Sequence, residues 1–416
     1  MTPQEKKLYI LISLFFFTLL VSWLRVANVV ITAGITIYSY VAFPMSEKLS
    51  LLKKRKGVQA MIFFSVLILV SFALSYNLSQ GINYLTLRLP LVIFPVSLGL
   101  LQLSATFKEK ALLTFAYITT LVCVLCFGYA LYNYFILGRA DAMYNDNLTL
   151  LIGHQSVYVA LLVNFAIYIF LYLLLFRKVS FRAGVFCSIL FLTGISYLLG
   201  SRINLAILLV MCVGISIYYI LNKKLFVHGV ALFIALVVGA FIVFKAEPLM
   251  LNRYKELAYS KFEYDHIGTE SHYFMELTPD QWNGTNFRLA AWNCGWELFK
   301  ENPLIGVGLG DKKEELIQKY KQKDFYFAIE TNKNVHNNYL DILYSMGLIG
   351  FAFFLLAWVI FPLIEAVKYH DILALMMLIT LALAWVTEIY FDRSVGGMIS
   401  GFFVVFLLTD KKNAEV

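Results

Sequence analysis

Long apolar stretches separated by short polar segments run through most of the chain. Twelve of them approach the roughly 20 residues that a helix needs to cross a hydrocarbon core of about 30 Å. By residue number they are 8–24, 26–43, 58–76, 84–103, 111–137, 155–176, 181–199, 203–221, 225–244, 337–361, 370–387 and 395–409. The pattern predicts an all-α polytopic membrane protein with about twelve transmembrane helices.

One polar segment is much too long to be a simple connection between two helices. Residues 245–336 hold twelve basic and fourteen acidic residues and also many aromatic ones. Within this segment, leucine and aromatic residues recur at intervals of three and four from Leu289 to Phe299, which predicts a helix over about 286–300. A loop of this size usually carries function.

We therefore expect three parts along the chain. They are residues 1–244 with nine transmembrane helices, residues 245–336 as a large and partly helical loop, and residues 337–416 with three more helices and a tail.

The composition agrees with a membrane protein. Of the 416 residues, 60% are hydrophobic and only 14% are charged, whereas soluble proteins are about 45–50% apolar and about 25% charged. These values exclude a soluble enzyme, a disordered chain and a nucleic-acid-binding domain. The five cysteines show no spacing typical of a metal site.

The basic residues predict the orientation of the chain. One set of short loops, together with both termini, holds seventeen Lys and Arg residues, and the alternate short loops hold only Arg25, Arg139, Arg202 and Arg393. Basic loops face the cytoplasm, so we expect both termini there and residues 245–336 on the opposite, exoplasmic side. This rule also explains the net charge of +8 without a nucleic-acid partner.

Four charged or titratable residues on the exoplasmic side are candidates for chemistry. Arg88 lies about one turn inside the fourth stretch, Arg202 lies in the turn Gly200-Ser201-Arg202, Arg288 lies on the predicted loop helix, and His336 lies where the loop re-enters the membrane. Ionisable groups in or beside a bilayer are costly and usually functional. Guanidinium groups bind phosphate oxygens in a bidentate way, and an imidazole accepts a proton from an alcohol near neutral pH.

Each candidate also has a structural interpretation. Arg88 could extend to the interface, Arg202 and Arg288 could be solvated charges, and Asn337 or Asn338 after His336 could cap the following helix. Taken together, the four suit a site for a lipid diphosphate, and we expect substrate contacts also from Asn337, Asn338, Trp292 and Arg139. No Asp-x-Asp pair or His/Asp cluster occurs on this side, so we expect no metal and no cofactor. The nearest acids are interpreted as solvated loop residues or as partners of Arg139 and Arg393; they are Asp141, Asp146, Glu388 and Asp392.

Several sequence motifs between residues 285 and 350 resemble the bacterial O-antigen ligase family, which is related to O-antigen polymerases and to protein O-oligosaccharyltransferases. They are Arg288-Leu289-x-x-Trp292, Asn302-Pro303-Leu304-Ile305-Gly306-Val307-Gly308, His336-Asn337-Asn338-Tyr339-Leu340-Asp341 and Gly347-Leu348-Ile349-Gly350. The upstream Gly200-Ser201-Arg202 resembles the Ser-Arg turn of this family, as does the large loop late in the chain.

The resemblance implies a metal-independent, inverting glycosyltransferase at the periplasmic face of the bacterial inner membrane. Its donor would be a glycan on undecaprenyl diphosphate, its acceptor a sugar hydroxyl of lipid A–core, and its catalytic residues Arg202, Arg288 and His336. A polymerase or a protein O-oligosaccharyltransferase with the same donor is the alternative. A twelve-helix transporter or flippase is a third interpretation, because Pro90 and Pro95 could break the fourth helix.

Overall fold

The computed structural model describes residues 1–177, 181–223 and 281–409, with positions 230, 234, 262–264 and 278 between them. Its described part is helical and contains no β-strand. Seven of the described helices are long and apolar enough to cross a membrane, and three more are apolar but shorter. The predicted helical membrane fold is confirmed to this extent, and the predicted span 225–244 lies almost entirely outside the described residues.

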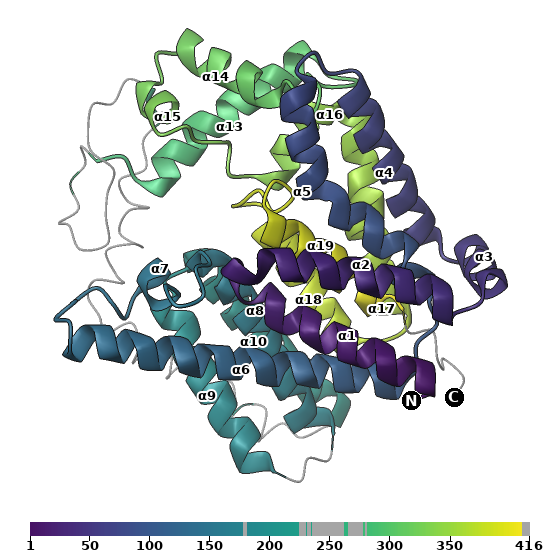
Figure 1. Ribbon diagram of the computed structural model, residues 1–416. Helices are drawn as coiled ribbons and strands as arrows, with labels where there is room; N and C mark the ends of the chain where they lie inside the picture. The colour runs from purple at the N-terminus through teal and green to yellow at the C-terminus, as the bar shows by residue number, and fades with distance from the viewer. Residues whose placement is uncertain are drawn as a thin grey trace.

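The helices follow one another in the order seen in Figure 1. Their bounds are α1 Pro3–Leu19, α2 Arg25–Ala42, α3 Met45–Lys54, α4 Lys56–Ala73, α5 Leu78–Val96, α6 Ala105–Phe135, α7 Asn145–Leu148, α8 Ser156–Phe176, α9 Arg182–Leu198, α10 Arg202–Lys223, α13 Gly284–Glu301, α14 Lys312–Gln322, α15 Tyr326–Glu330, α16 Asn338–Leu355, α17 Phe361–Lys368, α18 Ile372–Ala384 and α19 Ser394–Leu407. Short 3₁₀ turns precede α2 and follow α5, and a π-helical turn joins α16 to α17.

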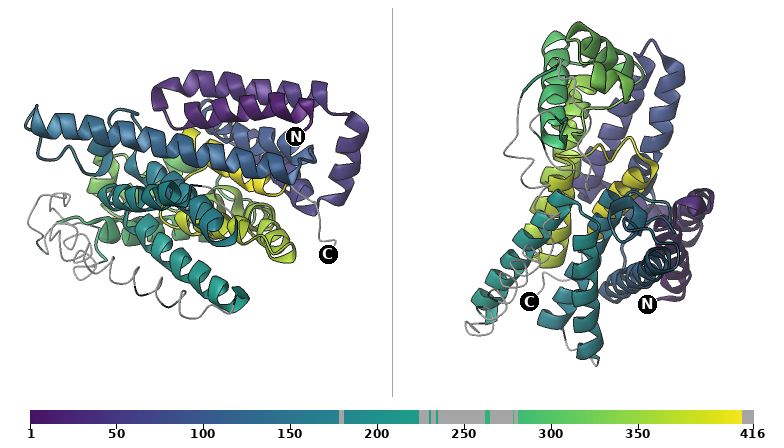
Figure 2. Two further views of the ribbon diagram at one scale, coloured as in Figure 1. Left: turned by 90° about the horizontal axis from the view of Figure 1, so that it is seen from below. Right: turned by 90° about the vertical axis from the view of Figure 1, so that its left-hand side faces the viewer.

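Most membrane helices pack against helices that are next to them in the sequence, and a few pack against distant ones. Helices α1 and α2 form a hairpin along α6 (Figure 2), α4 and α5 form a second pair, and α19 packs against α5. The core between them is rich in phenylalanine: Phe15, Phe16 and Phe402 are fully buried and their rings pack against one another. Helix α8 is buried around most of its circumference.

The start of α1, the end of α19 and two of the basic loops lie together. Glu5, near the start of α1, accepts the backbone N–H of Ser104, and Lys108 donates to the Leu407 carbonyl at the end of α19. The buried Arg55 donates to the Thr409 carbonyl at the same place. The segments that the basic-loop rule groups together therefore do lie together.

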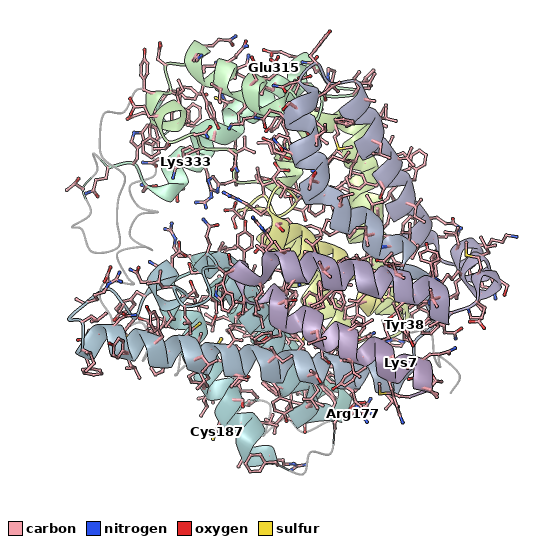
Figure 3. All side chains as sticks on the ribbon, viewed as in Figure 1. Lys7, Tyr38, Arg177, Cys187, Glu315 and Lys333 are labelled. Atoms are coloured by element: carbon pink, nitrogen blue, oxygen red, sulfur yellow. The ribbon has the colours of Figure 1, made fainter. Side chains whose placement is uncertain are left out.

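Helices α13, α14 and α15 form a cap at the other end, away from Lys7 and Arg177 (Figure 3). The prediction of a helix over 286–300 is confirmed by α13, which begins slightly earlier because the Asn283 side chain accepts two backbone N–H groups of its first turn. The cap has its own apolar core, in which Trp282 stacks on Phe327 with ring centroids 5.2 Å apart. Trp282 is 1% exposed, so it is not a sugar-stacking surface.

The cap is fastened to α16 through two glycine-containing segments. Val307 and Gly308 donate backbone hydrogen bonds to Tyr344 and Ser345, where Gly347 has a φ of 65° and kinks α16. A Cβ atom on Gly347 would overlap the backbone of the cap segment. The motif of residues 302–308 and the motif of residues 347–350 thus fit against each other, which gives them a packing role.

One predicted boundary was wrong in a way that matters for the site. The fourth span was expected to begin at 84, but α5 begins at Leu78 because Asn77 caps it. Arg88 therefore lies near the middle of α5, and not one turn from its start. The helix continues through Pro90 and ends just after Pro95, so neither proline breaks it.

Candidate active site

The candidate base, His336, is held in a defined orientation at the start of α16. Its backbone has a φ of 46°, and its N–H donates to the Asn334 side chain at 2.9 Å. Its ring packs edge-on against Phe287 of α13, with centroids 5.7 Å apart. Trp292, also on α13, donates its indole N–H to the Val335 carbonyl and so fixes the residue before the histidine.

Glu388 fixes the protonation pattern of this imidazole. Its Oε2 lies 2.9 Å from Nδ1 of His336. Burial on its own raises the pKa of Glu388, but the hydrogen bond from His336 and the positive charge of Arg288 outweigh it and hold the pKa below its ordinary value. Because an ionised carboxylate only accepts hydrogen bonds, Nδ1 is the donor in this contact, which leaves Nε2 as the ring nitrogen that can face a substrate.

Arg202 and Arg288 converge beside this pair. The position that a Cβ atom would take on Gly284 lies 2.9 Å from Nη1 of Arg288 and 3.4 Å from Nη2 of Arg202. Arg288 also donates to the Gly284 carbonyl at 2.8 Å and, more weakly, to that of Thr387, next to Glu388. Two guanidinium groups, an imidazole and a carboxylate thus come together from α10, α13, α16 and the segment before α19.

Hydrogen bonds to α8 hold the turn that carries Arg202. Gly200 has a φ of 62°, which favours glycine, and Asn204 donates to Ser201 and to the Val157 carbonyl. Asn164 of α8 in turn donates to the Asn204 carbonyl. These buried amides connect α8 to α10 next to the turn that carries Arg202.

Arg88 does not join this group. It is 0% exposed and forms ion pairs of 2.9 Å with Asp341 of α16 and with Asp392. Lys312 of α14 pairs with the same two carboxylates. The interpretation of Arg88 as an interfacial side chain was wrong, and its guanidinium group is committed to a buried network of two cations and two anions, which we call the four-charge network.

The four-charge network also corrects the expectation for two acids. Glu388 and Asp392 were expected to be solvated or paired with Arg393, but Glu388 faces His336 and Asp392 faces Arg88 and Lys312. Burial raises the pKa of Asp392, and the charges of Lys312 and Arg88 lower it by more, so that its net shift is downward. Within the described part of the chain, no group of three His, Cys, Asp or Glu side chains is arranged to hold a metal ion.

The other residues predicted to contact substrate do not lie together. Asn337 caps α16 by accepting the Leu340 N–H, and Asn338 is fully buried and accepts the Phe391 N–H. Both amides therefore have structural roles, but only Asn337 caps the helix, whereas Asn338 binds the segment before α19. Arg139 lies on the α6–α7 connection, half-exposed and 3.9 Å from Asp141.

Comparison with known families bears on this arrangement. Residues 187–355 match the family model described as O-antigen ligase. This part of the chain is similar to the O-antigen ligase family. The matched segment contains Arg202, Arg288 and His336, whereas Glu388 lies beyond it. No curated protein matches the chain. The apolar helices, together with this similarity, indicate a multi-pass membrane protein.

Sequence reasoning missed Glu388, Lys312 and Asp341. Glu388 ends an apolar stretch on the predicted exoplasmic side, so the rule that intramembrane acids mark function could have selected it. Asp341 closes the motif that begins at His336 and faces inward one turn along α16. Lys312 gave no such signal, because only tertiary packing separates it from the neighbouring surface lysines.

The four-charge network predicts a large effect for Arg88→Met. The substitution leaves two buried carboxylates with one cation, and breaking a buried ion pair in this way costs about 3–5 kcal/mol. We expect a strongly lowered Tm in detergent, partly restored in Arg88→Met/Asp392→Leu, which removes one charge of each sign. Arg139→Met, at an exposed pair, should change Tm little. Equal effects of the Arg88 and Arg139 variants would contradict the network.

Glu388 predicts a specific acid dependence of stability. Its pKa is lowered on folding, so its contribution is complete above the unfolded value of about 4.3 and is lost as pH falls through the lower folded value. We expect wild type to be more stable than Glu388→Gln at about pH 6, and the gap in Tm to close towards about pH 3. A gap that is constant over this range would mean that the carboxylate is not ionised in the folded protein.

Proposed function

We propose that this protein is an O-antigen ligase that transfers a glycan from undecaprenyl diphosphate to a sugar hydroxyl of lipid A–core. The family assignment supports this class of reaction, and the observation that carries the proposal is the His336–Glu388 pair beside two convergent arginines. We place the reaction at the periplasmic face of the inner membrane, in a chain with about twelve spans and both termini in the cytoplasm. The loop of residues 245–336 then lies in the periplasm.

The proposed chemistry is a single displacement at the anomeric carbon. Nε2 of His336 takes the proton of the acceptor hydroxyl while its oxygen forms the new glycosidic bond. The bond from the anomeric carbon to the diphosphate oxygen breaks, and that oxygen leaves with the electron pair. The configuration inverts because attack and departure occur on opposite faces of the sugar.

Arg202 and Arg288 meet the charge that the departing diphosphate develops. Preorganised positive groups are commonly the largest catalytic contribution, with about 3–4 kcal/mol lost for each donor removed. With two fixed cations at this place, the reaction is proposed to run without a metal ion or cofactor. Arg88 contributes indirectly, because its partner Asp392 belongs to the same segment as Glu388.

A polymerase or a protein O-oligosaccharyltransferase would use the same donor and the same groups. The three differ in the hydroxyl that His336 deprotonates. The purified protein can be given the lipid-linked donor together with one of three acceptors: lipid A–core, a second lipid-linked repeat or a Ser/Thr peptide. Under our proposal it should modify only lipid A–core. Transfer to either of the others instead would reassign the acceptor while leaving the chemistry intact.

Variants at the site give the direct test of the chemistry. In membranes with equal protein levels, His336→Ala should lower kcat by about 10²–10⁴ and Arg288→Ala by about 10²–10³. Glu388→Gln should lower kcat with little change in donor KM, because it misorients the base without touching the diphosphate. Arg177→Ala, at the opposite end of α8, is the matched control. Full activity in both His336→Ala and Arg288→Ala would disprove the assignment.

A further inference from the structure

A polar cavity of about 170 Å³ is lined by none of the residues that the proposed chemistry uses. Its walls come from the α1–α2 turn, the segment before α8 and the start of α19. Arg25 and Arg393 both line it, and both side chains are exposed. No Asp or Glu is among the described residues that line it, so its fixed charges are all positive.

Three helices begin at this cavity, which adds to its positive potential. Helices α2 and α19 start at Arg25 and Ser394, and neither has a side chain that caps its amino end. Helix α8 starts at Ser156, whose N–H is already accepted by Asp146 just outside the cavity. The amino end of α19 is therefore the one available to an anion, because a 3₁₀ turn runs directly into α2 and the Arg25 N–H donates to the Ser22 carbonyl.

An unpartnered buried hydroxyl gives independent support for a bound ligand. Tyr158 lines the cavity and is 2% exposed, and its Oη has no hydrogen-bond partner within the described structure. A buried hydroxyl without a partner is destabilising, and a ligand oxygen in the cavity would supply the missing hydrogen-bond partner. The neighbouring His154 donates Nε2–H to the Leu19 carbonyl, and burial lowers its pKa, so the positive charge rests on the two arginines.

Tyr158 connects the cavity with the segment that carries Glu388. The ring of Tyr158 packs edge-on against Tyr390, with centroids 5.1 Å apart, and Tyr390 is two residues from Glu388. Arg393 also lines a neighbouring cavity of about 160 Å³ that includes Asp392. A molecule anchored in the cavity between Arg25 and Arg393 would therefore lie beside the Tyr158–Tyr390 pair without occupying the Arg202–Arg288 position.

We propose that this cavity binds a phosphate group carried by the acceptor glycolipid, with Arg25, Arg393 and the Tyr158 hydroxyl as its ligands. This inference rests on the proposed function, since it assigns the second substrate of the same site. The diphosphate of the donor and the phosphate of the acceptor then have separate cationic positions. Such a division lets both anionic lipids bind at once and directs the acceptor hydroxyl towards Nε2.

The test compares a phosphorylated glycolipid acceptor with the same glycolipid after chemical removal of its phosphates. In purified protein in nanodiscs, Arg25→Gln and Arg393→Gln should each raise acceptor KM roughly tenfold, as expected for loss of one charge-assisted contact. Tyr158→Phe should raise it by a smaller factor. Donor KM and kcat should stay unchanged, and Arg177→Gln, which removes the same charge at the other end of α8, should match wild type.

The dephosphorylated acceptor supplies the internal control. Wild type should show a raised KM for the dephosphorylated acceptor, and the two arginine substitutions should not raise this KM any further. The assignment is overturned if the variants raise KM equally for both acceptors, or if they raise donor KM instead. Arg393→Lys keeps the charge next to Asp392 and should recover most of the affinity.

A binding measurement without donor separates this inference from the proposed function. Wild type should bind the phosphorylated glycolipid at least tenfold more tightly than its dephosphorylated form, and Arg25→Gln/Arg393→Gln should abolish the difference. Phosphatidylglycerol or inorganic phosphate that competes as well as the glycolipid would show a general phosphate site and overturn the acceptor assignment. If no acceptor is glycosylated yet this binding pattern holds, the proposed function fails while the phosphate site stands.

Discussion

The four-charge network of Arg88, Lys312, Asp341 and Asp392 is the constraint on which the arrangement of the site depends. Its members come from α5, α14, α16 and the segment before α19, so it joins the cap to the membrane helices. Such a network gains little net stability over apolar packing, because desolvation offsets most of the attraction. It does penalise misalignment, since any shift of one element leaves an uncompensated buried charge. The segment that carries Glu388 is thereby held in one register against α16, which carries His336.

The chemistry that this frame supports follows from the pairing of groups. A histidine hydrogen-bonded to a buried, ionised glutamate has one nitrogen fixed as a donor and the other available as a base. Two arginines beside it supply positive charge that does not depend on pH. Tyr390 packs against Tyr158, which lines the cavity between Arg25 and Arg393, and none of the His336 site residues lines that cavity, so the two proposed anion positions are distinct.

Much of this could be predicted from the sequence, because membrane helices, basic loops and the helical period of α13 are local signals. His336, Arg202 and Arg288 could be selected for the same reason, since each is a polar residue in a place where polar residues are costly. The role of Arg88 could not, because its two carboxylate partners are more than 250 residues away in the chain. Glu388 was misassigned for a related reason: sequence proximity favoured Arg393 as its neighbour, whereas the fold places His336 there.

The central claim is that a lipid diphosphate binds at Arg202 and Arg288 with its glycan facing Nε2 of His336. The most direct measurement is a cryo-EM structure of Glu388→Gln, slowed in turnover, with undecaprenyl-diphosphate-linked glycan bound. We predict density for the diphosphate against both guanidinium groups, with the anomeric carbon on the side of His336. Diphosphate density in the cavity between Arg25 and Arg393, or far from both arginine pairs, would contradict the account.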